Sequence, residues 1–226
     1  MHVLFVCNGN VCRSPIAERL TRALAEDMDL RRLSAESAGV RALSGFPMEP
    51  LAAKVLTGLG GDPTGFKARK LRLDMIDRAD LVLAMTVAIR DKIIGMGPGI
   101  NGRTFALVEA YRIAKVTGAA SVEELHAARD DLALVGNEDI SDPVGLSETL
   151  FCSVGDRIAE ALLPLLLALN PRPVELPGPT DLAADDPPEP PASLRSDGKV
   201  LAFRRPEVRR KPLAPVHDYE PESRQA

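Results

Sequence analysis

A cysteine, an arginine and a serine stand close together near the start of the chain, and their spacing suits one kind of chemistry. Five residues separate Cys7 from Arg13, and Ser14 follows directly. A thiolate is a strong nucleophile, and a planar guanidinium can hold two oxygens of a tetrahedral oxyanion at once. The sequence predicts a loop that surrounds one phosphate group and consists of Cys7, Asn8, Gly9, Asn10, Val11, Cys12, Arg13 and Ser14.

The sequence around this loop supports the prediction. An apolar run at residues 3–6 is typical of a strand buried on both faces, and it places Cys7 at the end of that strand. Ser14 and Pro15 then predict a helix start, with Ser14 as N-cap and Pro15 at the first helical position. Gly9, between two asparagines, permits positive φ values and a tight curve. Backbone N–H groups would converge on the anion there, and their positive field favours the thiolate form of Cys7.

Cleavage of a phosphate monoester also needs a proton donor for the leaving oxygen. Asp142 is a candidate, because Pro143 restricts it to extended backbone and can direct its carboxyl from a loop. Asp139 is the alternative donor, and Asp139 and Glu138 are otherwise interpreted as solvated loop charges. No cluster has metal-ligand spacing, so neither a metal nor a cofactor is predicted. The histidines stand apart in the sequence and are interpreted as bystanders: His2, His126 and His217.

Four segments of the chain resemble the low-molecular-weight protein tyrosine phosphatase family. They are VLFVCNGNVCRSPIAE at residues 3–18, SAG at 37–39, ADLVLAM at 79–85 and DISDPVG at 139–145. The resemblance covers residues 1–169 and implies a metal-independent phosphate-monoester hydrolase of the protein-tyrosine-phosphatase type. It implies a cysteinyl-phosphate intermediate on Cys7, phosphate binding by Arg13 and the loop amides, and Asp142 as general acid and then base.

The other two cysteines have different interpretations. Cys12 lies inside the loop, and it is either a small packed side chain or the partner of Cys7 in a reversible, protective disulfide, which the resemblance supports. Cys152 falls in the last predicted helix and is interpreted as a core residue. An odd number of cysteines without the spacing of a disulfide framework indicates a reducing, cytoplasmic location.

Three positions depart from the family's pattern. Val144 follows the Asp-Pro pair, where the family commonly has an aromatic residue that walls the phosphotyrosine ring. Residues 41–44 also lack an aromatic side chain, although Phe46 could turn inward. Phe66 stands where the family often has a histidine that supports the loop, which predicts a less rigid loop and lower turnover. The expected substrate is therefore a phosphorylated protein or a small aryl phosphate.

Two other functions stay open on the sequence alone. Thiol-dependent arsenate reductases share this fold and loop, but their chemistry relays a disulfide through further cysteines, and residues 86–96 contain none. A non-catalytic phosphate-binding adaptor could use the same loop, and the missing aromatic wall favours it. The complete set of Cys7, Arg13, Ser14 and Asp142 favours the enzyme.

The first 170 residues alternate strand and helix patterns, which indicates an α/β fold. We predict strands at residues 3–6, 33–37, 81–85 and 105–108, and helices from Ser14 and at residues 50–59, 86–94, 121–132 and 147–163 or beyond. The expected architecture is a single doubly wound sheet of about four parallel strands flanked by helices on both faces. Such sheets bind ligands beyond the carboxyl ends of their strands, where Cys7 stands.

Composition divides the chain near residue 170. Residues 1–169 are the predicted catalytic domain, whereas residues 170–226 hold 12 of the 19 prolines and alternate acidic with basic stretches. This tail is predicted to be disordered because it lacks regularly spaced apolar residues, and it is a candidate docking segment for a protein partner. The net charge of −4 gives no sign of nucleic-acid binding, and no apolar stretch is long enough to be a transmembrane segment.

Overall fold

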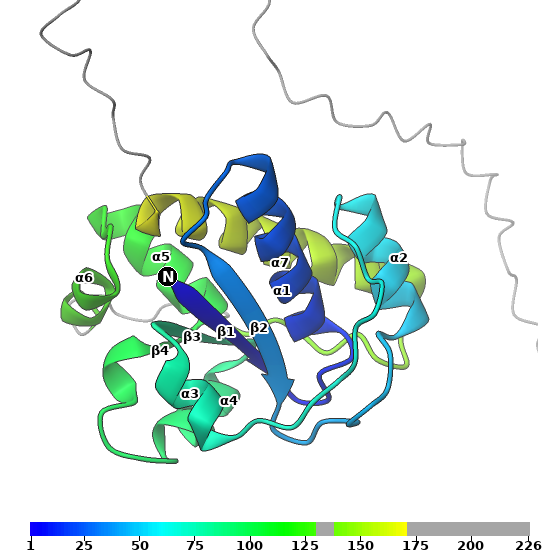
Figure 1. Cartoon of the computed structure of the whole chain (residues 1–226), viewed down its shortest axis with the longest axis horizontal. Coiled ribbons are helices and arrows are strands. Elements are labelled where there is room, and N and C mark those ends of the chain that lie inside the picture. Colours follow the sequence, from blue (N-terminus) through cyan, green and yellow to red (C-terminus); the bar gives the residue numbers. More distant parts are fainter. Residues whose placement is uncertain (130–137, 171–226) are drawn as a thin grey trace, which may run out of the picture. The chain divides into compact units, whose positions relative to one another are not determined.

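A parallel sheet forms the middle layer of the fold (Figure 1), in a computed structural model that describes residues 1–129 and 138–170. Its four strands lie in the order β2-β1-β3-β4, and all neighbours are parallel. The strands are β1 (His2–Cys7), β2 (Ser34–Gly39), β3 (Leu81–Ala84) and β4 (Thr104–Ala106). The predicted parallel α/β sheet is therefore confirmed. The predicted tail lies outside the described residues from residue 171 onward.

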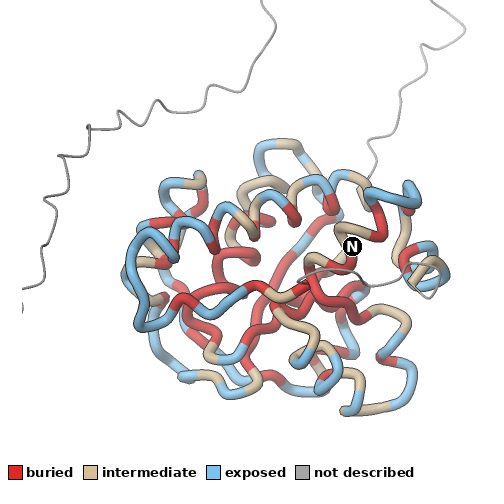
Figure 2. Tube along the Cα trace, turned by 180° about the vertical axis from the view of Figure 1, so that it is seen from behind, coloured by how far each residue is buried: buried red, intermediate tan, exposed pale blue. Residues whose placement is uncertain are grey.

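Helices cover both faces of the sheet, because successive side chains of each strand point to opposite sides. Phe5 and Leu83 belong to one apolar cluster, and Leu4 and Val82 belong to the other. The first cluster includes residues of α1 (Arg13–Asp27), α2 (Pro50–Gly58), α5 (Leu107–Thr117), α6 (Val122–Ala127) and α7 (Glu148–Leu169). The second includes residues of α3 (Leu73–Arg78) and α4 (Val87–Ile94). The strands are accordingly the most buried part of the chain trace (Figure 2).

The fourth strand is shorter than predicted, and a helix follows it that the sequence did not predict. The apolar run at residues 105–108 continues from β4 into α5, and a short apolar run does not distinguish strand from helix. The Glu109 carboxylate accepts a hydrogen bond from the N–H of Ala106 at 2.8 Å, and this contact begins the helix. The prediction also missed α3, which has only six residues.

Of the last two predicted helices, one is shorter than predicted within the described residues, and the other extends beyond residue 163, as predicted. The described part of the predicted helix at 121–132 ends at Ala127, and residues 130–132 lie outside the described residues. The final helix continues past Pro164 to Leu169. Pro164 is exposed, so the carbonyl that loses its helical partner there can bind water instead. No helix within residues 1–129 and 138–170 is both long and apolar enough to cross a membrane.

The sheet topology determines where a ligand can bind. β1 lies between β2 and β3, so the chain leaves β1 toward one neighbour and later returns on its other side. In sheets of this kind the crevice at the carboxyl end of the central strand, where the order reverses, is the usual binding site. Cys7 is the last residue of that strand.

Candidate active site

The loop between β1 and α1 is held from outside through its carbonyl groups. Each of these carbonyls accepts a hydrogen bond from a backbone N–H of the segment that follows β2. The pairs are Val40 to Cys7 at 3.1 Å, Arg41 to Asn8 at 2.9 Å, Leu43 to Gly9 at 3.0 Å and Glu49 to Val11 at 2.8 Å. Because N–H and C=O point in opposite directions across a planar trans peptide, the loop amides turn inward. The N–H of Asn10 lies 3.2 Å from Sγ of Cys7.

The tight curve of the loop is made by Asn10 and not, as predicted, by Gly9. The φ of Asn10 is 55°, in the left-handed region that asparagine tolerates, whereas Gly9 is not among the residues with positive φ. The Asn10 side chain is fully buried and is bonded on both ends. Its Nδ2 donates to the hydroxyls of Ser14 at 3.0 Å and Ser37 at 2.9 Å, and its Oδ1 accepts from the N–H of Arg69 at 2.8 Å.

Ser14 is not the N-cap, so that prediction was wrong. The helix α1 begins at Arg13, and Cys12 occupies the N-cap position without a side-chain cap. The Ser14 hydroxyl instead donates to Sγ of Cys7 across 2.9 Å. An N-cap side chain precedes the first helical residue and accepts from a backbone N–H of the first turn, whereas Ser14 already lies inside that turn.

A chain of buried polar groups fixes the direction of that Ser14 hydroxyl. Ser37 donates its proton to the Glu18 carboxylate at 2.5 Å, and Glu18 is paired with Arg22 at 2.7 Å. The Ser37 oxygen is then free to accept from Asn10, which also donates to Ser14. With its oxygen accepting from Asn10, Ser14 turns its proton toward Cys7. The chain of bonds therefore orients the Ser14 hydroxyl as a donor to the sulfur.

Sequence reasoning did not find Glu18 and Ser37 as site residues. Ser37 opens the SAG segment that carried part of the resemblance, but nothing in the sequence gave it a partner across the loop.

Phe66, which stands where the family often has a histidine, is 7% exposed. The Arg19 guanidinium lies 5.7 Å from the centroid of the Phe66 ring. A phenyl ring cannot hydrogen-bond the loop as a histidine could, and the described side-chain support of Asn10 comes from Ser37, which is bonded to Glu18.

Arg13 and Asp142 meet at the mouth of the loop, although they are far apart in sequence. The Arg13 side chain is buried, and its Nη1 donates to the carbonyl of Ile140 at 2.9 Å. Its Nη2 forms an ion pair with the Asp142 carboxylate, which is 44% exposed. The Nε of Arg13 is buried and has no hydrogen-bond partner among the described residues. One donor of the guanidinium is therefore available to an anion inside the loop.

The segment that carries Asp142 is attached to the end of the sheet. The N–H of Ile140 donates to the carbonyl of Met85 at 2.8 Å, and the Asp139 carboxylate accepts from the N–H of Val87 at 2.8 Å. Glu138 is 5% exposed and ion-paired with Arg112. The interpretation of Glu138 and Asp139 as solvated charges was therefore wrong, because both bind groups that hold this segment in place.

A cavity of about 180 Å³ opens above Cys7. It is lined by the loop residues Cys7, Asn8, Gly9, Val11, Cys12 and Arg13, and by Arg41, Leu43, Asp142 and Val144. Leu43 and Val144 are each 51% exposed and form an aliphatic rim. Phe46 is 61% exposed and does not line the cavity, so it does not supply an aromatic wall.

The three cysteines have different surroundings, and all are free thiols. Burial raises the pKa of the Cys12 thiol, and the neighbouring Cys7 raises it further, so Cys12 stays protonated at neutral pH. A disulfide between Cys7 and Cys12 stays a hypothesis. Cys152 is exposed on α7, so its interpretation as a core residue was wrong. Phe151 and Val154 occupy the buried face of that helix instead.

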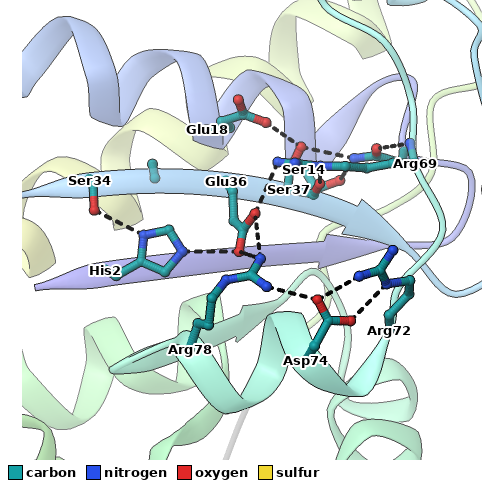
Figure 3. Close-up of polar contacts among 12 residues, drawn as sticks. His2, Ser14, Glu18, Ser34, Glu36, Ser37, Arg69, Arg72, Asp74 and Arg78 are labelled. Atoms are coloured by element: carbon teal, nitrogen blue, oxygen red, sulfur yellow. Dashed lines mark hydrogen bonds and ion pairs between the residues drawn. The ribbon is translucent and has the colours of Figure 1, made fainter.

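A second polar cluster lies on the far side of β2 from the loop (Figure 3). Glu36 is 7% exposed and binds His2 at 3.0 Å, Arg78 at 3.1 Å and Arg69 at 3.3 Å. His2 is therefore not an isolated bystander. Burial alone would raise the pKa of Glu36, but the bond to His2 and the two guanidinium groups outweigh it and hold that pKa below its ordinary value. Since the N–H of Arg69 also binds Asn10, the cluster is continuous with the loop.

Comparisons with known proteins place the chain in a family. The family model for low molecular weight phosphotyrosine protein phosphatases matches residues 2–129. The chain belongs to this family. The similar proteins that belong to the family are cysteine-dependent phosphatases. This chain is a phosphatase of the same type.

Named relatives of this phosphatase act on more than one kind of phosphorylated residue. A probable low molecular weight protein-tyrosine-phosphatase, EpsP of Ralstonia nicotianae, is 39% identical over 107 residues, which are 47% of this chain and 70% of the relative. A protein-arginine-phosphatase of Geobacillus stearothermophilus is 36% identical over 135 residues, 58% of this chain and 87% of the relative. The crystal structure of a low molecular weight protein tyrosine phosphatase from T. tengcongensis aligns with a TM-score of 0.58 at 28% identity, covering 74% of this chain and 97% of that one.

Proposed function

We propose that this phosphatase hydrolyses phosphotyrosine in proteins through a cysteinyl-phosphate on Cys7. The observation that carries the proposal is the convergence of donors on one sulfur. The Ser14 hydroxyl lies 2.9 Å from Sγ and the Asn10 N–H lies 3.2 Å from it, while Arg13 and Asp142 line the same cavity. A thiolate held in this way is a nucleophile aimed into a site that binds a phosphoryl group.

In the first step the Cys7 thiolate attacks phosphorus, and an S–P bond forms as the bond to the phenolic oxygen breaks. Asp142 gives its proton to that oxygen, so the product leaves as a neutral phenol. The inward-facing loop amides and Arg13 hold the three remaining phosphoryl oxygens, whose charge must be stabilised in the transition state.

The Arg13–Asp142 ion pair suggests how Asp142 obtains the proton that it must donate. The phosphate dianion and the Asp142 carboxylate both require the Nη2 of Arg13, which now pairs with Asp142. Nε and Nη2 lie on one edge of the guanidinium and can hold two phosphate oxygens together. A bound dianion would therefore displace the carboxylate and favour its protonation.

In the second step water attacks the phosphocysteine, and Asp142, now a carboxylate, removes a proton from that water. The S–P bond breaks and the electron pair returns to Cys7. The Ser14 hydroxyl then stabilises the departing thiolate through the same 2.9 Å contact. Orthophosphate is released, the Cys7 thiolate and the protonated Asp142 are regenerated, and water is the co-reactant.

The rim supports an aryl substrate without stacking. Leu43 and Val144 can contact the ring through aliphatic carbons, which contribute burial but no aromatic pair energy. Arsenate reduction has less support, because Cys152 does not line the cavity and is exposed on α7. A protein that only bound phosphate would need no proton donor, so the Asp142 carboxyl that lines the cavity favours the enzyme.

Hydrolysis of phenyl phosphate and p-nitrophenyl phosphate by the wild type, Cys7→Ser and Asp142→Asn tests the mechanism. Cys7→Ser should lose turnover and still bind orthophosphate. Asp142→Asn should slow phenyl phosphate by roughly 10²–10⁴-fold, and p-nitrophenyl phosphate much less, because p-nitrophenolate leaves without a proton. Cys152→Ser is the matched cysteine control and should keep wild-type rates. Turnover by Cys7→Ser equal to the wild type would refute the nucleophile assignment.

A further inference from the structure

Arg41 is a cation at the cavity mouth that the proposed mechanism does not use. Arg41 lines the same cavity as Cys7 and Arg13. Its backbone N–H donates to the carbonyl of Asn8 at 2.9 Å, and the neighbouring N–H of Leu43 donates to Gly9 at 3.0 Å. These bonds fix the position of the Arg41 backbone relative to the nucleophilic loop. The Arg41 side chain therefore starts from a fixed point beside the site where a phosphoryl group would bind.

The charge of Arg41 is not neutralised by the protein. Arg41 is exposed and has no ion-pair partner within 4.0 Å in the part of the chain that the structure describes. The other charged residues that line the cavity are Arg13 and Asp142, and these two are paired with each other. Because Arg13 and the loop amides already hold the phosphoryl oxygens, a second anion of the substrate is the natural partner for Arg41.

We propose that Arg41 selects phosphotyrosine substrates that carry a carboxylate next to the phosphorylated residue. The inference rests on the proposed function and extends it to the substrate sequence. Leu43 and Val144 contact the ring, and Arg41 contacts the flanking carboxylate outside the ring's position. The same charge repels a substrate with a cation near the phosphoryl group, which includes a phosphoarginine side chain.

The chain itself offers a suitable probe sequence. Tyr219 is flanked by Asp218 and Glu220, which lie outside the described residues. A synthetic peptide of residues 214–223 with phosphorylated Tyr219 presents carboxylates on both sides of the phosphorylated residue. A matched peptide with Asp218→Asn and Glu220→Gln keeps the size and hydrogen-bonding groups and removes both charges.

The experiment compares kcat/KM for the two peptides in the full-length wild type and in three variants of it. The wild type should prefer the acidic peptide by about three- to fivefold at low ionic strength, as for an exposed charge pair, and less in high salt. Arg41→Met should bring the ratio of the two kcat/KM values close to one, and Arg41→Glu should invert it. Arg31→Met removes the same charge from an exposed site elsewhere and should keep the wild-type ratio.

The outcomes separate this inference from the proposed function. A wild type without preference, or an Arg41→Met variant that keeps it, overturns the role of Arg41 while leaving the phosphatase assignment standing. An equal loss of kcat/KM for both peptides in Arg41→Met indicates a structural role and also overturns it. Hydrolysis of p-nitrophenyl phosphate without hydrolysis of either peptide overturns the protein-tyrosine specificity, and the inference with it.

Discussion

The base of the cavity and its rim are built in different ways. At the base, Cys7, Asn10 and Ser14 are at most 2% exposed, and hydrogen bonds from β2, α1 and the segment before α3 fix them. At the rim, Leu43 and Val144 are each 51% exposed, and Arg41 has no ion-pair partner among the described residues. The base can hold the reacting groups in one geometry, while the rim can change without disturbing it. This division suits an enzyme whose chemistry is constant and whose substrates differ.

Removing Asn10 should cause the largest loss at the base. Asn10→Ala leaves the Ser14 and Ser37 hydroxyls without their shared donor, so Ser14 can rotate away from the sulfur. We expect kcat for p-nitrophenyl phosphate to fall on the order of 10²-fold, as when one preorganised donor is lost. The free energy of unfolding, measured in urea, should fall by about 1–3 kcal/mol because buried partners lose a hydrogen bond.

A second asparagine provides the control for this substitution. Asn170→Ala removes a side chain that only donates to the Leu166 carbonyl at the end of α7, so it should keep the wild-type rate. An Asn10→Ala protein that folds and keeps wild-type kcat would show that the base does not depend on this network.

Gly39 tests how closely β2 must approach the loop. A Cβ at this position would lie 2.5 Å from the Asn8 oxygen and 2.9 Å from the Asn10 nitrogen, so Gly39→Ala must displace the loop. We expect a loss of about 1–3 kcal/mol in the free energy of unfolding, as for an overpacked core, and a lower kcat. Gly58→Ala is the matched control, since its Cβ would meet nothing within 4 Å. Similar results for the two variants would contradict the requirement for close approach.

Residues 7–14 could be predicted as a site because the signal is contiguous. A buried strand, a loop and a helix follow one another there, although the residue that curves the loop is Asn10 and not Gly9, and the N-cap is Cys12 and not Ser14. The fold was predictable for the same reason, since buried strands alternate with helices. The approach of Arg13 to Asp142 was reached only through the family resemblance, because no local pattern links residues so far apart.

Other features depend on tertiary contacts that no local pattern reveals. Glu18 and Ser37 stand on a helix and a strand whose packing brings them together, and neither has a distinctive neighbour in sequence. Cys152 was misplaced because a residue's position in a helix does not determine which face the fold buries. The helix α5 was missed because its first residues continue an apolar run from β4.

Adding an aromatic residue at the rim should change substrate affinity while leaving the base intact. Val144→Phe places a ring beside the cavity, where it can pack against the phenyl group of a substrate. We expect KM for phenyl phosphate to fall by about two- to tenfold, consistent with an aromatic pair worth about 0.5–1.5 kcal/mol. An alkyl phosphate without a ring should show no such gain. Equal gains for both substrates would mean that the rim does not contact the ring.

Replacing Glu36 tests how far the rigid base of the cavity extends. We expect this substitution to have the smallest effect of those proposed. The pKa of the Glu36 carboxyl is held below its ordinary value in the folded protein. The carboxylate therefore stabilises the fold at pH values above the unfolded pKa of about 4.3. This stabilisation is lost as the pH falls through the lower pKa of the folded state. Glu36→Gln should therefore lower the free energy of unfolding by on the order of 1 kcal/mol or less at pH 7. The difference from the wild type should shrink below about pH 4, which urea denaturation at several pH values can measure.

The kcat of Glu36→Gln locates the boundary between the base and the rest of the fold. Arg69 binds Glu36 through its guanidinium and Asn10 through its N–H, but the second bond uses the backbone and does not require the first. We therefore expect stability to fall while kcat for p-nitrophenyl phosphate stays near the wild-type value. A parallel fall in kcat would extend the rigid base through Arg69 to the cluster at β2, because the backbone bond alone would then be insufficient to hold Asn10.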